Sequence, residues 1–480
     1  MNYEPVIGLE VHAQLFTKSK IFCRCSTTFG APQNSQVCPI CLGMPGVLPV
    51  LNCLAVEFAI RMGLATNCKI APHSIFARKN YFYPDLPKGY QISQYEEPLC
   101  ESGGVEFEQE DGSFKRVSLI RIHLEEDAGK SMHGEAYVGE DETLVDVNRC
   151  GVPLIEIVSG PDIRSPREAY LYLNKIRQLV RYLGICDGNM EEGSLRCDAN
   201  VSVRPVGESK FGIKTELKNM NSFRGVEKAL EFEIDRQSKL IQSGGKVVQQ
   251  TALWDSTAGK VIPMRSKEMA HDYRYFPEPD LVPLRVDEKW REGIRESLGE
   301  LPMARRNRFV EQYALPKYDA DVLTEERAVA EYFEEVARQS KDAKLASNWV
   351  MGDILRLIKD KKIDITECPI KPAVLAEMLN LISSGTISGK IAKEVFEEMA
   401  QTGKSAKTIV SEKGLIQVSD TVVIEKAVDE LLAAHPKEVG RYRGGEEKLF
   451  GFFVGQLMKA MKGKANPQMA NEVLKRKLTK

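Results

Sequence analysis

The sequence of 480 residues contains no apolar run that approaches the ~20 residues of a membrane-spanning helix. It has no internal repeat and no low-complexity tract, and its N-terminal stretch MNYEPVIGLE carries an acid where a secretory signal is basic. Its net charge is small, with 66 basic against 68 acidic residues. These absences exclude a membrane protein, a repeat protein and a highly charged disordered chain, and they predict a folded cytoplasmic protein.

A phosphate-binding loop of the Walker type is also absent. The stretch RIHLEEDAGKS, residues 121–131, ends in Gly129, Lys130 and Ser131, as that motif does. Its first glycine would fall at position 124, which is Leu124, so the match fails. If the chain uses a nucleotide, it must hold the phosphates in another way.

The cysteines indicate a metal site. Eleven cysteines in a cytoplasmic chain are expected to be reduced thiols. Cys23 with Cys25 and Cys38 with Cys41 form two close pairs, separated by twelve residues. Two such pairs can bring four thiolates onto one tetrahedral Zn²⁺, which then has no open position for catalysis. The pattern predicts a structural zinc site, with buried or incidental thiols as the alternative.

Hydrophobic periodicity divides the chain into three parts. Residues 1–292 combine alternating, β-branched stretches such as VIGLEVHAQL and ANVSVRP with two long helical patterns, REAYLYLNKIRQLVRYLG and GVEKALEFEIDRQSKLIQSGG. Residues 293–405 have helical spacing in nearly every segment, and residues 406–480 form a smaller helical unit. The expected fold class is α+β, a large domain with a mixed or antiparallel sheet followed by two all-helical domains.

The first part carries the candidate catalytic residues. A nucleotide held without a Walker loop needs carboxylates that bind Mg²⁺, because the ion bridges and neutralises phosphate oxygens. GLEVH places Glu10 and His12 two apart on a predicted strand and therefore on one face. The other candidates are Glu125 or Glu126 in HLEED, Asp198 in RCDAN and Glu216 in KTELKN. Each acid alone is more readily explained as a solvated or salt-bridged residue, and His12 as a core histidine.

Basic and amide side chains accompany these acids. Residues 79–95, KNYFYPDLPKGYQISQY, crowd tyrosines and lysines between prolines, which excludes a long regular element there. We interpret this segment as the lining of a substrate site or polar passage, or else as an aromatic-packed loop. The candidates for binding the nucleotide are Lys79, Lys88, Arg196, Asn200 and Lys218.

The C-terminal segment is basic. Against the single acid Glu472, residues 456–480 contain Lys459, Lys462, Lys464, Lys475, Arg476, Lys477 and Lys480. Such a cluster is typical of a surface that meets RNA phosphates, or of a solvated helix face.

Taken together, these stretches resemble one known family, the B subunit of the bacterial tRNA-dependent amidotransferase that acts on glutamyl-tRNA(Gln) and aspartyl-tRNA(Asn). The similar motifs follow one another in unchanged order from the N-terminus to the tail. They are VIGLEVHAQL, RKNYFYPDLPKGYQISQY, HLEEDAGKS, GVPLIEIV, MEEGSLRCDANVSVRP, ELKNMNSF, DYRYFPEPDLVP and GKANPQ. Gly160, in the stretch SGPD, departs from the glutamate common in the family, away from the expected metal ligands.

The resemblance implies a cradle-like kinase and transamidase domain related to the glutamine synthetase catalytic fold over residues 1–292, then a helical domain, then a tail domain that contacts tRNA. It implies a heterotrimer with an amidase subunit, which releases ammonia from glutamine, and a small bracing subunit. The family's metal and ATP site uses the GLEVH, HLEED, CDAN and ELKN motifs, which here supply Glu10, His12, Glu125 or Glu126, Asp198 and Glu216.

The implied activity is ATP-dependent transamidation of charged tRNA(Gln), tRNA(Asn) or both. A carboxylate is a poor electrophile, so ATP with Mg²⁺ would convert it to an acyl phosphate that ammonia then attacks. The chain has no Gly- and Ser-rich amidase nucleophile motif, which agrees with ammonia made by a partner. The alternatives are a non-catalytic zinc-stabilised RNA-binding protein and a ligase for a free amino acid.

Overall fold

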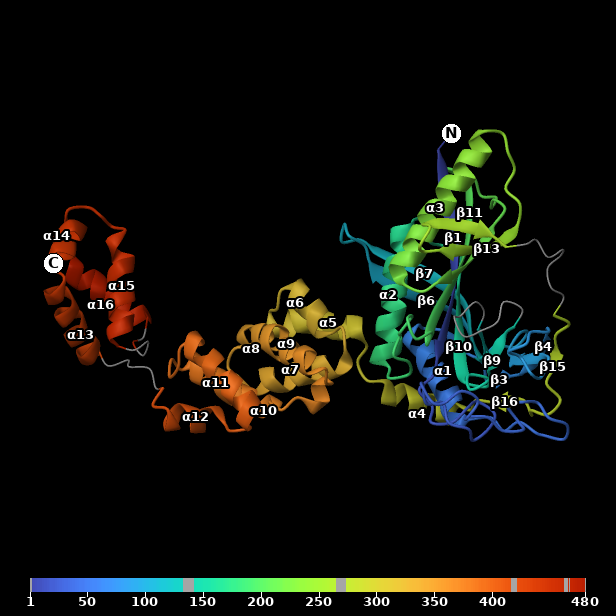
Figure 1. Cartoon of the computed structure of the whole chain (residues 1–480), viewed down its shortest axis with the longest axis horizontal. Coiled ribbons are helices and arrows are strands. Elements are labelled where there is room, and N and C mark those ends of the chain that lie inside the picture. The colour runs from blue at the N-terminus through green and yellow to red at the C-terminus, as the bar shows by residue number, and fades with distance from the viewer. Residues whose placement is uncertain are drawn as a thin grey trace. The chain divides into compact units, whose positions relative to one another are not determined.

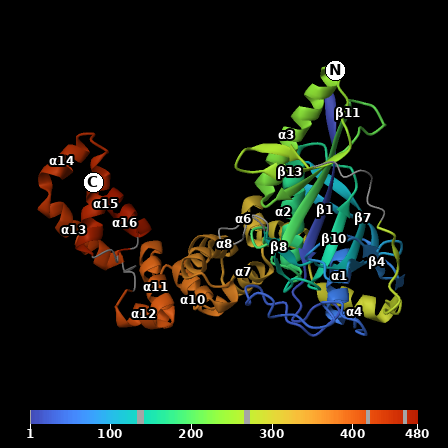
Figure 2. The same cartoon turned by 45° about the vertical axis from the view of Figure 1, so that its right-hand side comes forward.

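The structure is a computed structural model that describes residues 2–132, 142–264, 273–415, 421–461, 465 and 467–479. It divides into two compact units, Met1–Pro302 and Met303–Lys480 (Figures 1 and 2). One hydrophobic core lies in the first unit, and the described part of the second unit has two. Within the described ranges, no helix combines the length and the apolar character that crossing a bilayer requires.

The first unit is built on a nine-stranded sheet with the strand order β14-β13-β12-β11-β1-β10-β7-β6-β2. The strands are β1 (Tyr3–Gln14), β2 (Lys69–Ile70), β6 (Cys100–Glu108), β7 (Phe114–Glu126), β10 (Pro153–Ser159), β11 (Leu195–Pro205), β12 (Thr215–Met220), β13 (Gln250–Asp255) and β14 (Lys260–Pro263). All neighbouring strands are antiparallel except β12 and β13. The predicted α+β class with a large mixed sheet is therefore confirmed.

Three helices, α1 (Cys53–Ala65), α2 (Pro166–Tyr182) and α3 (Phe223–Gln242), pack against this sheet, and α4 (Glu288–Leu298) packs on α1 (Figures 1 and 2). Ser165 caps the N-terminus of α2, since its side chain accepts a hydrogen bond from the backbone N–H of Glu168 at 3.0 Å. Its apolar residues recur with helical spacing and are buried in the core: Ala169, Tyr172, Leu173, Ile176, Leu179 and Val180.

The central strand β1 explains why the sheet has two different faces. Ile7, Leu9, Val11 and Ala13 are fully buried in the core. The residues between them, including Glu10 and His12, are only half-buried, because alternate side chains of a strand point to opposite faces. One face of the sheet thus belongs to the apolar core, and the other carries polar side chains.

Shorter strands form separate small sheets. β4 (Ala77–Asn80), β5 (Tyr90–Ser93) and β15 (Phe276–Pro277) form a three-stranded sheet. Two further pairs are β3 (His73–Ser74) with β16 (Leu284–Arg285), and β8 (Lys130–Met132) with β9 (Leu144–Asp146). The expectation that residues 79–95 hold no long regular element is confirmed, since β4 ends at Asn80 and β5 begins at Tyr90.

The described part of the second unit is helical. Its helices are α5 (Pro302–Tyr313), α6 (Lys317–Leu323), α7 (Arg327–Gln339), α8 (Ala343–Trp349), α9 (Leu355–Lys361), α10 (Pro372–Ser383), α11 (Gly389–Thr402), α12 (Ala406–Glu412), α13 (Thr421–Ala434), α14 (Pro436–Arg443), α15 (Leu449–Ala460) and α16 (Pro467–Leu478). A π-helical turn, Val350–Ile354, joins α8 to α9, and a 3₁₀ turn, Ile365–Glu367, precedes α10. The buried side chains form two clusters, at 309–410 and 424–478. The division at 293–405 and 406–480 remains a prediction.

Candidate active site

Polar residues from neighbouring strands meet on the face of the sheet opposite the apolar core. In the register of the strands, Glu10 of β1 lies across from Asp198 of β11. His12 lies across from Arg196 of β11 on one side and from Glu156 of β10 on the other. Glu216 of β12 lies across from Asn200 of β11. The sheet therefore brings together candidates that are up to about 200 residues apart in the chain.

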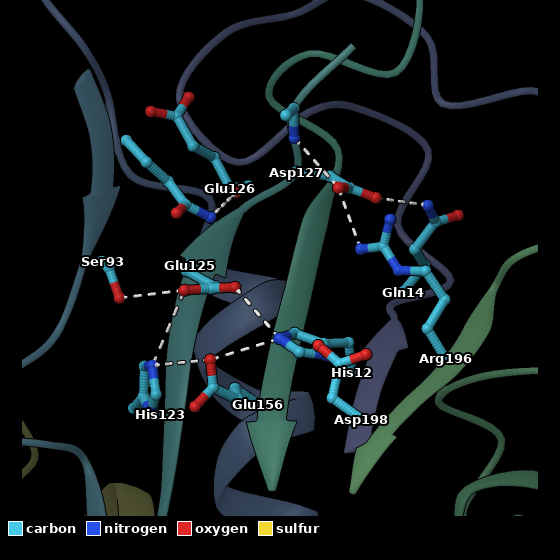
Figure 3. A network of polar contacts seen from close by, with 12 residues as sticks. His12, Gln14, Ser93, His123, Glu125, Glu126, Asp127, Glu156, Arg196 and Asp198 are labelled. Atoms are coloured by element: carbon cyan, nitrogen blue, oxygen red, sulfur yellow. Dashed lines mark hydrogen bonds and ion pairs between the residues drawn. The ribbon is translucent and has the colours of Figure 1, made fainter. Parts of the chain in front are cut away.

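His12, Glu125 and Glu156 form the most compact group on this face (Figure 3). His12 Nε2 lies 3.2 Å from Glu156 Oε2 and 3.8 Å from Glu125 Oε1. His123 Nε2 lies 3.7 Å from Glu125 Oε2 and 3.8 Å from Glu156 Oε2, on the other side of the two carboxylates. Ser93 Oγ donates a hydrogen bond to Glu125 Oε2 at 3.1 Å. Three neighbouring strands, β1, β10 and β7, supply the group.

The charges in this group favour ionised carboxylates. Burial raises the pKa of Glu156, but His123 and His12 outweigh it, so that its pKa lies well below the usual range. The pKa of Glu125 is also lowered against the effect of burial, chiefly by its hydrogen bond with His123. Burial opposes protonation of His12, yet Glu156 raises its pKa. Two ionised carboxylates and an imidazole can together hold a divalent cation.

The spacing of the ligand atoms fits such a cation. Ligands about 2.1 Å from an octahedral Mg²⁺ lie roughly 3 Å apart along the edges of the octahedron. The 3.2 Å between His12 Nε2 and Glu156 Oε2 matches such an edge, and Glu125 Oε1 is close to the same point.

A second acidic group lies on the adjoining strands. Lys218 Nζ is 2.8 Å from Asp198 Oδ2 and 3.1 Å from Glu216 Oε1. Glu10 Oε1 accepts a hydrogen bond from Asn200 Nδ2 at 3.0 Å. Burial raises the pKa of Glu10, and so do Glu156 and Glu216. Glu10 thus links the two groups electrostatically, and the crowded carboxylates favour additional positive charge.

Lys79 also acts on the carboxylates of the first group. Burial lowers its pKa, but Glu125 and Glu156 raise it, so the ammonium stays charged near these carboxylates. Its Nζ lies 4.9 Å from the ring centre of Tyr273 and 5.8 Å from that of Tyr81. Aromatic rings therefore hold the cation beside the acids.

Three other predicted site residues are engaged elsewhere. Glu126 forms an ion pair with Lys88 and accepts a hydrogen bond from the backbone of Ile92 at 2.8 Å. Arg196 Nη2 lies 2.9 Å from Asp127 Oδ1, and Gln14 Nε2 donates to Asp127 Oδ2 at 2.6 Å (Figure 3). Of the two alternatives in HLEED, it is Glu125 that joins His12.

The sequence interpretation did not single out Glu156 or His123. Glu156 is the one acid in the apolar stretch PLIEIV, and only 8% of the residue is exposed. An isolated acid within an apolar strand is a signal that could have been used, because a buried charge requires a partner. The role of His123 depends on strand register, which the sequence does not reveal.

The four paired cysteines converge between β1 and α1. Their sulfur atoms lie within 4.8 Å of one another, and Sγ of Cys41 is 3.9 Å from Cys23, 3.8 Å from Cys25 and 3.6 Å from Cys38. Thiolates about 2.3 Å from a tetrahedral Zn²⁺ would be roughly 3.8 Å apart. The geometry is therefore compatible with zinc, and all four thiols are free of disulfide bonds.

The basic residues of the tail have different surroundings. Arg476 and Lys477 of α16 pair with Glu425 and Asp429 of α13. Lys459 and Lys475 are exposed. The other predicted phosphate-binding residues, Lys462, Lys464 and Lys480, lie outside the described residues, as do Gly463 and Asn466 of GKANPQ.

Comparison with known proteins places this chain among the transamidating enzymes. The GatB/GatE catalytic domain matches residues 5–292, and the GatB domain matches residues 331–478. The chain belongs to this family. Its relatives include proteins named as the B subunit of aspartyl/glutamyl-tRNA(Asn/Gln) amidotransferase, from Thermodesulfovibrio yellowstonii (61% identity, 99% of each chain), Geobacter sulfurreducens (61%, all of each chain) and Chlorobium luteolum (60%, all of each chain).

Proposed function

We propose that the chain is the cytoplasmic B subunit of a tRNA-dependent amidotransferase. It activates the side-chain carboxyl of glutamyl-tRNA(Gln), aspartyl-tRNA(Asn) or both with ATP and then amidates it with ammonia. An amidase subunit supplies the ammonia from glutamine, and a third, small subunit stabilises the heterotrimer. Family membership and full-length relatives with this name support the proposal. The large unit is the cradle, related to the glutamine synthetase catalytic fold.

The His12, Glu125 and Glu156 group is the observation that carries the proposal. It would hold Mg²⁺, which neutralises the transferred phosphoryl group when bound. Glu10, Asp198 and Glu216 extend the acidic surface toward the nucleotide. Lys218, with 39% of its side chain exposed between two acids, and Asn200 present donors to phosphate oxygens.

Lys79 would bind the carboxyl of the substrate. Its ammonium lies near Glu125 and against the Tyr273 and Tyr81 rings, so it can orient an anionic group next to the metal ligands. A carboxyl held there is already placed for the reaction, so the step no longer depends on a chance bimolecular encounter.

Residues 79–95, which include Lys88, line a polar passage for ammonia in this proposal. A closed route protects ammonia from protonation in bulk water and the activated carboxyl from hydrolysis. The cysteine cluster of Cys23, Cys25, Cys38 and Cys41 holds a structural Zn²⁺, and the tail contacts tRNA. Arg196, which is bound by Asp127, supports the site from its edge.

The test uses the full complex with charged tRNA, ATP and either glutamine or ammonium. Glu125→Gln and Asp198→Asn are expected to lose about 100-fold or more in amidation, since a metal contributes several kcal/mol to the transition state. Both variants should retain tRNA binding. Glu101→Gln, at an exposed acid of the same sheet, serves as the control. Full activity of Glu125→Gln would contradict the assigned site.

The non-catalytic RNA-binding alternative is not supported by the comparisons. An RNA-binding function also does not explain why acids gather on five neighbouring strands. Wild-type complex that binds tRNA but forms no amide would restore it. Amide formation on a free amino acid without tRNA would instead favour the stand-alone ligase.

A further inference from the structure

Lys20 is buried without a visible partner. None of its surface is exposed, and within the described ranges its Nζ has no hydrogen-bond acceptor. An ammonium removed from water without compensation is strongly unfavourable. The structure therefore calls for negative charge close to this side chain.

The position of Lys20 identifies where that charge lies. Lys20 lines a cavity of about 90 Å³ together with Cys23, Cys41, Lys88 and Glu126. A Cβ atom placed on Gly151 would lie 3.5 Å from Lys20 Cδ, 3.9 Å from Cys41 Cβ and 3.9 Å from Glu126 Oε2. The lysine, the cysteine and the glutamate thus surround one point.

The backbone holds Lys20 against the cysteine cluster. Its N–H donates to the carbonyl of Cys25 at 2.9 Å, and the N–H of Ile21 donates to the carbonyl of Gly151 at 2.9 Å. Ser19 and Ser26, on either side, form an isolated β-bridge. The segment before Cys23 is therefore tied to the segment that follows it.

The carboxylates around the cavity already have partners. Glu126 is paired with Lys88 and with the backbone of Ile92, and Asp280 lies 3.3 Å from Arg78. Four thiolates around one Zn²⁺ leave two net negative charges. We propose that Lys20 is the counter-cation of the four-cysteine metal centre and compensates the negative charge that four thiolates keep around a bound Zn²⁺. This inference rests on the proposed zinc site.

The proposal predicts that Lys20 stabilises the metal-loaded protein more than the metal-free protein. Without metal the centre lacks the two net negative charges of four zinc-bound thiolates, so the buried ammonium is less well compensated. With metal the ammonium and the thiolates stabilise each other, and by linkage Lys20 must strengthen zinc binding. A role in packing alone would affect both forms equally.

The experiment uses the full chain in its complex. It compares the wild type with Lys20→Met, which keeps the length of the side chain and removes its charge. Lys18→Met is the matched control, because Lys18 is exposed two residues earlier. Competition with a chromogenic chelator should show zinc affinity reduced about tenfold or more in Lys20→Met, within the usual range of such couplings. Lys18→Met should bind zinc like the wild type.

Thermal unfolding gives the second readout. Lys20→Met should lower the midpoint of the first unit more in the zinc form than in the metal-free protein. In the cobalt-substituted protein, its sulfur-to-metal charge-transfer bands should move to longer wavelength, because the thiolate electrons lose a nearby positive charge. Lys20→Arg, which keeps the charge, should leave the bands in place.

Equal zinc affinity in Lys20→Met and Lys18→Met would overturn the proposal. If Lys20→Met does not fold while Lys20→Arg does, the requirement for charge is supported; loss of folding in both variants would assign Lys20 a packing role and overturn it. A wild-type protein that retains no zinc would refute the zinc site itself, and the inference with it. The two failures are therefore distinguishable.

Discussion

The partners of Glu125 and Glu126 became clear only from the three-dimensional structure. The sequence offered both as metal ligands, because adjacent strand residues point to opposite faces and the register was unknown. In the structure Glu125 joins His12, whereas Glu126 binds Lys88. The types of residue in the site could be predicted from the sequence, but their partners could not.

Asp127 provides a prediction at this scale. Burial raises the pKa of its carboxyl, but Arg196 and Arg149 outweigh burial and lower the pKa below the usual range. Asp127→Asn should therefore lower the free energy of unfolding by about 1.5–3 kcal/mol at pH 7, the usual contribution of hydrogen bonds to a charged group. Urea unfolding followed by tryptophan fluorescence measures this loss.

The pH dependence of Asp127→Asn follows from the lowered pKa. The ionised carboxylate stabilises the fold above the unfolded pKa of about 3.9, and this contribution is lost as the pH falls through the lower folded pKa. The difference between wild type and variant should be constant near neutrality and shrink below about pH 4. A difference that shrinks between pH 8 and pH 6 would contradict the assignment.

Helices and strands were the elements most readily predicted. The patterns starting REAYLYL and GVEKALEF became α2 and α3, because apolar residues at helical spacing had an apolar sheet to cover. Strand order was not predictable: the sequence gives no sign that β1 lies between β10 and β11. That order decides which acids meet.

The contact between α2 and the sheet can be tested at Ile176, which is fully buried. Ile176→Ala should reduce the free energy of unfolding by about 2–5 kcal/mol, because it leaves a cavity in the core. Arg177→Ala, at the exposed neighbour, should change it by less than about 0.5 kcal/mol. Equal effects in denaturant titrations would mean that α2 is not anchored through this face.

At the scale of the whole molecule, the sequence pattern predicted that segments with helical spacing begin near residue 290. The first compact unit extends to Pro302, because α4 packs on α1. Periodicity identifies a helix but not the surface on which it packs, so the boundary could not be placed from the pattern alone.

The tail offers a prediction about tRNA binding, which rests on the proposed function. Lys459 and Lys475 are exposed, whereas Lys477 lies 2.5 Å from Asp429. Replacing Lys459 and Lys475 with Gln should weaken binding and reduce the slope of log affinity against log salt by about 1–2. Lys477→Gln should change the slope less. Filter binding over a salt series measures both, and the opposite ranking would argue against contact through this surface.

The alternation along β1 has a consequence for misfolding. Leu9 and Val11 of β1 are buried, whereas Glu10 and His12 lie on the polar face of the sheet. A shift of the strand by one position would therefore place Glu10 and His12 in the apolar core and remove them from the candidate active site. A molecule in that arrangement could not persist as a well-folded but inactive competitor. The correct register of β1 is thus required both for a stable fold and for the candidate active site.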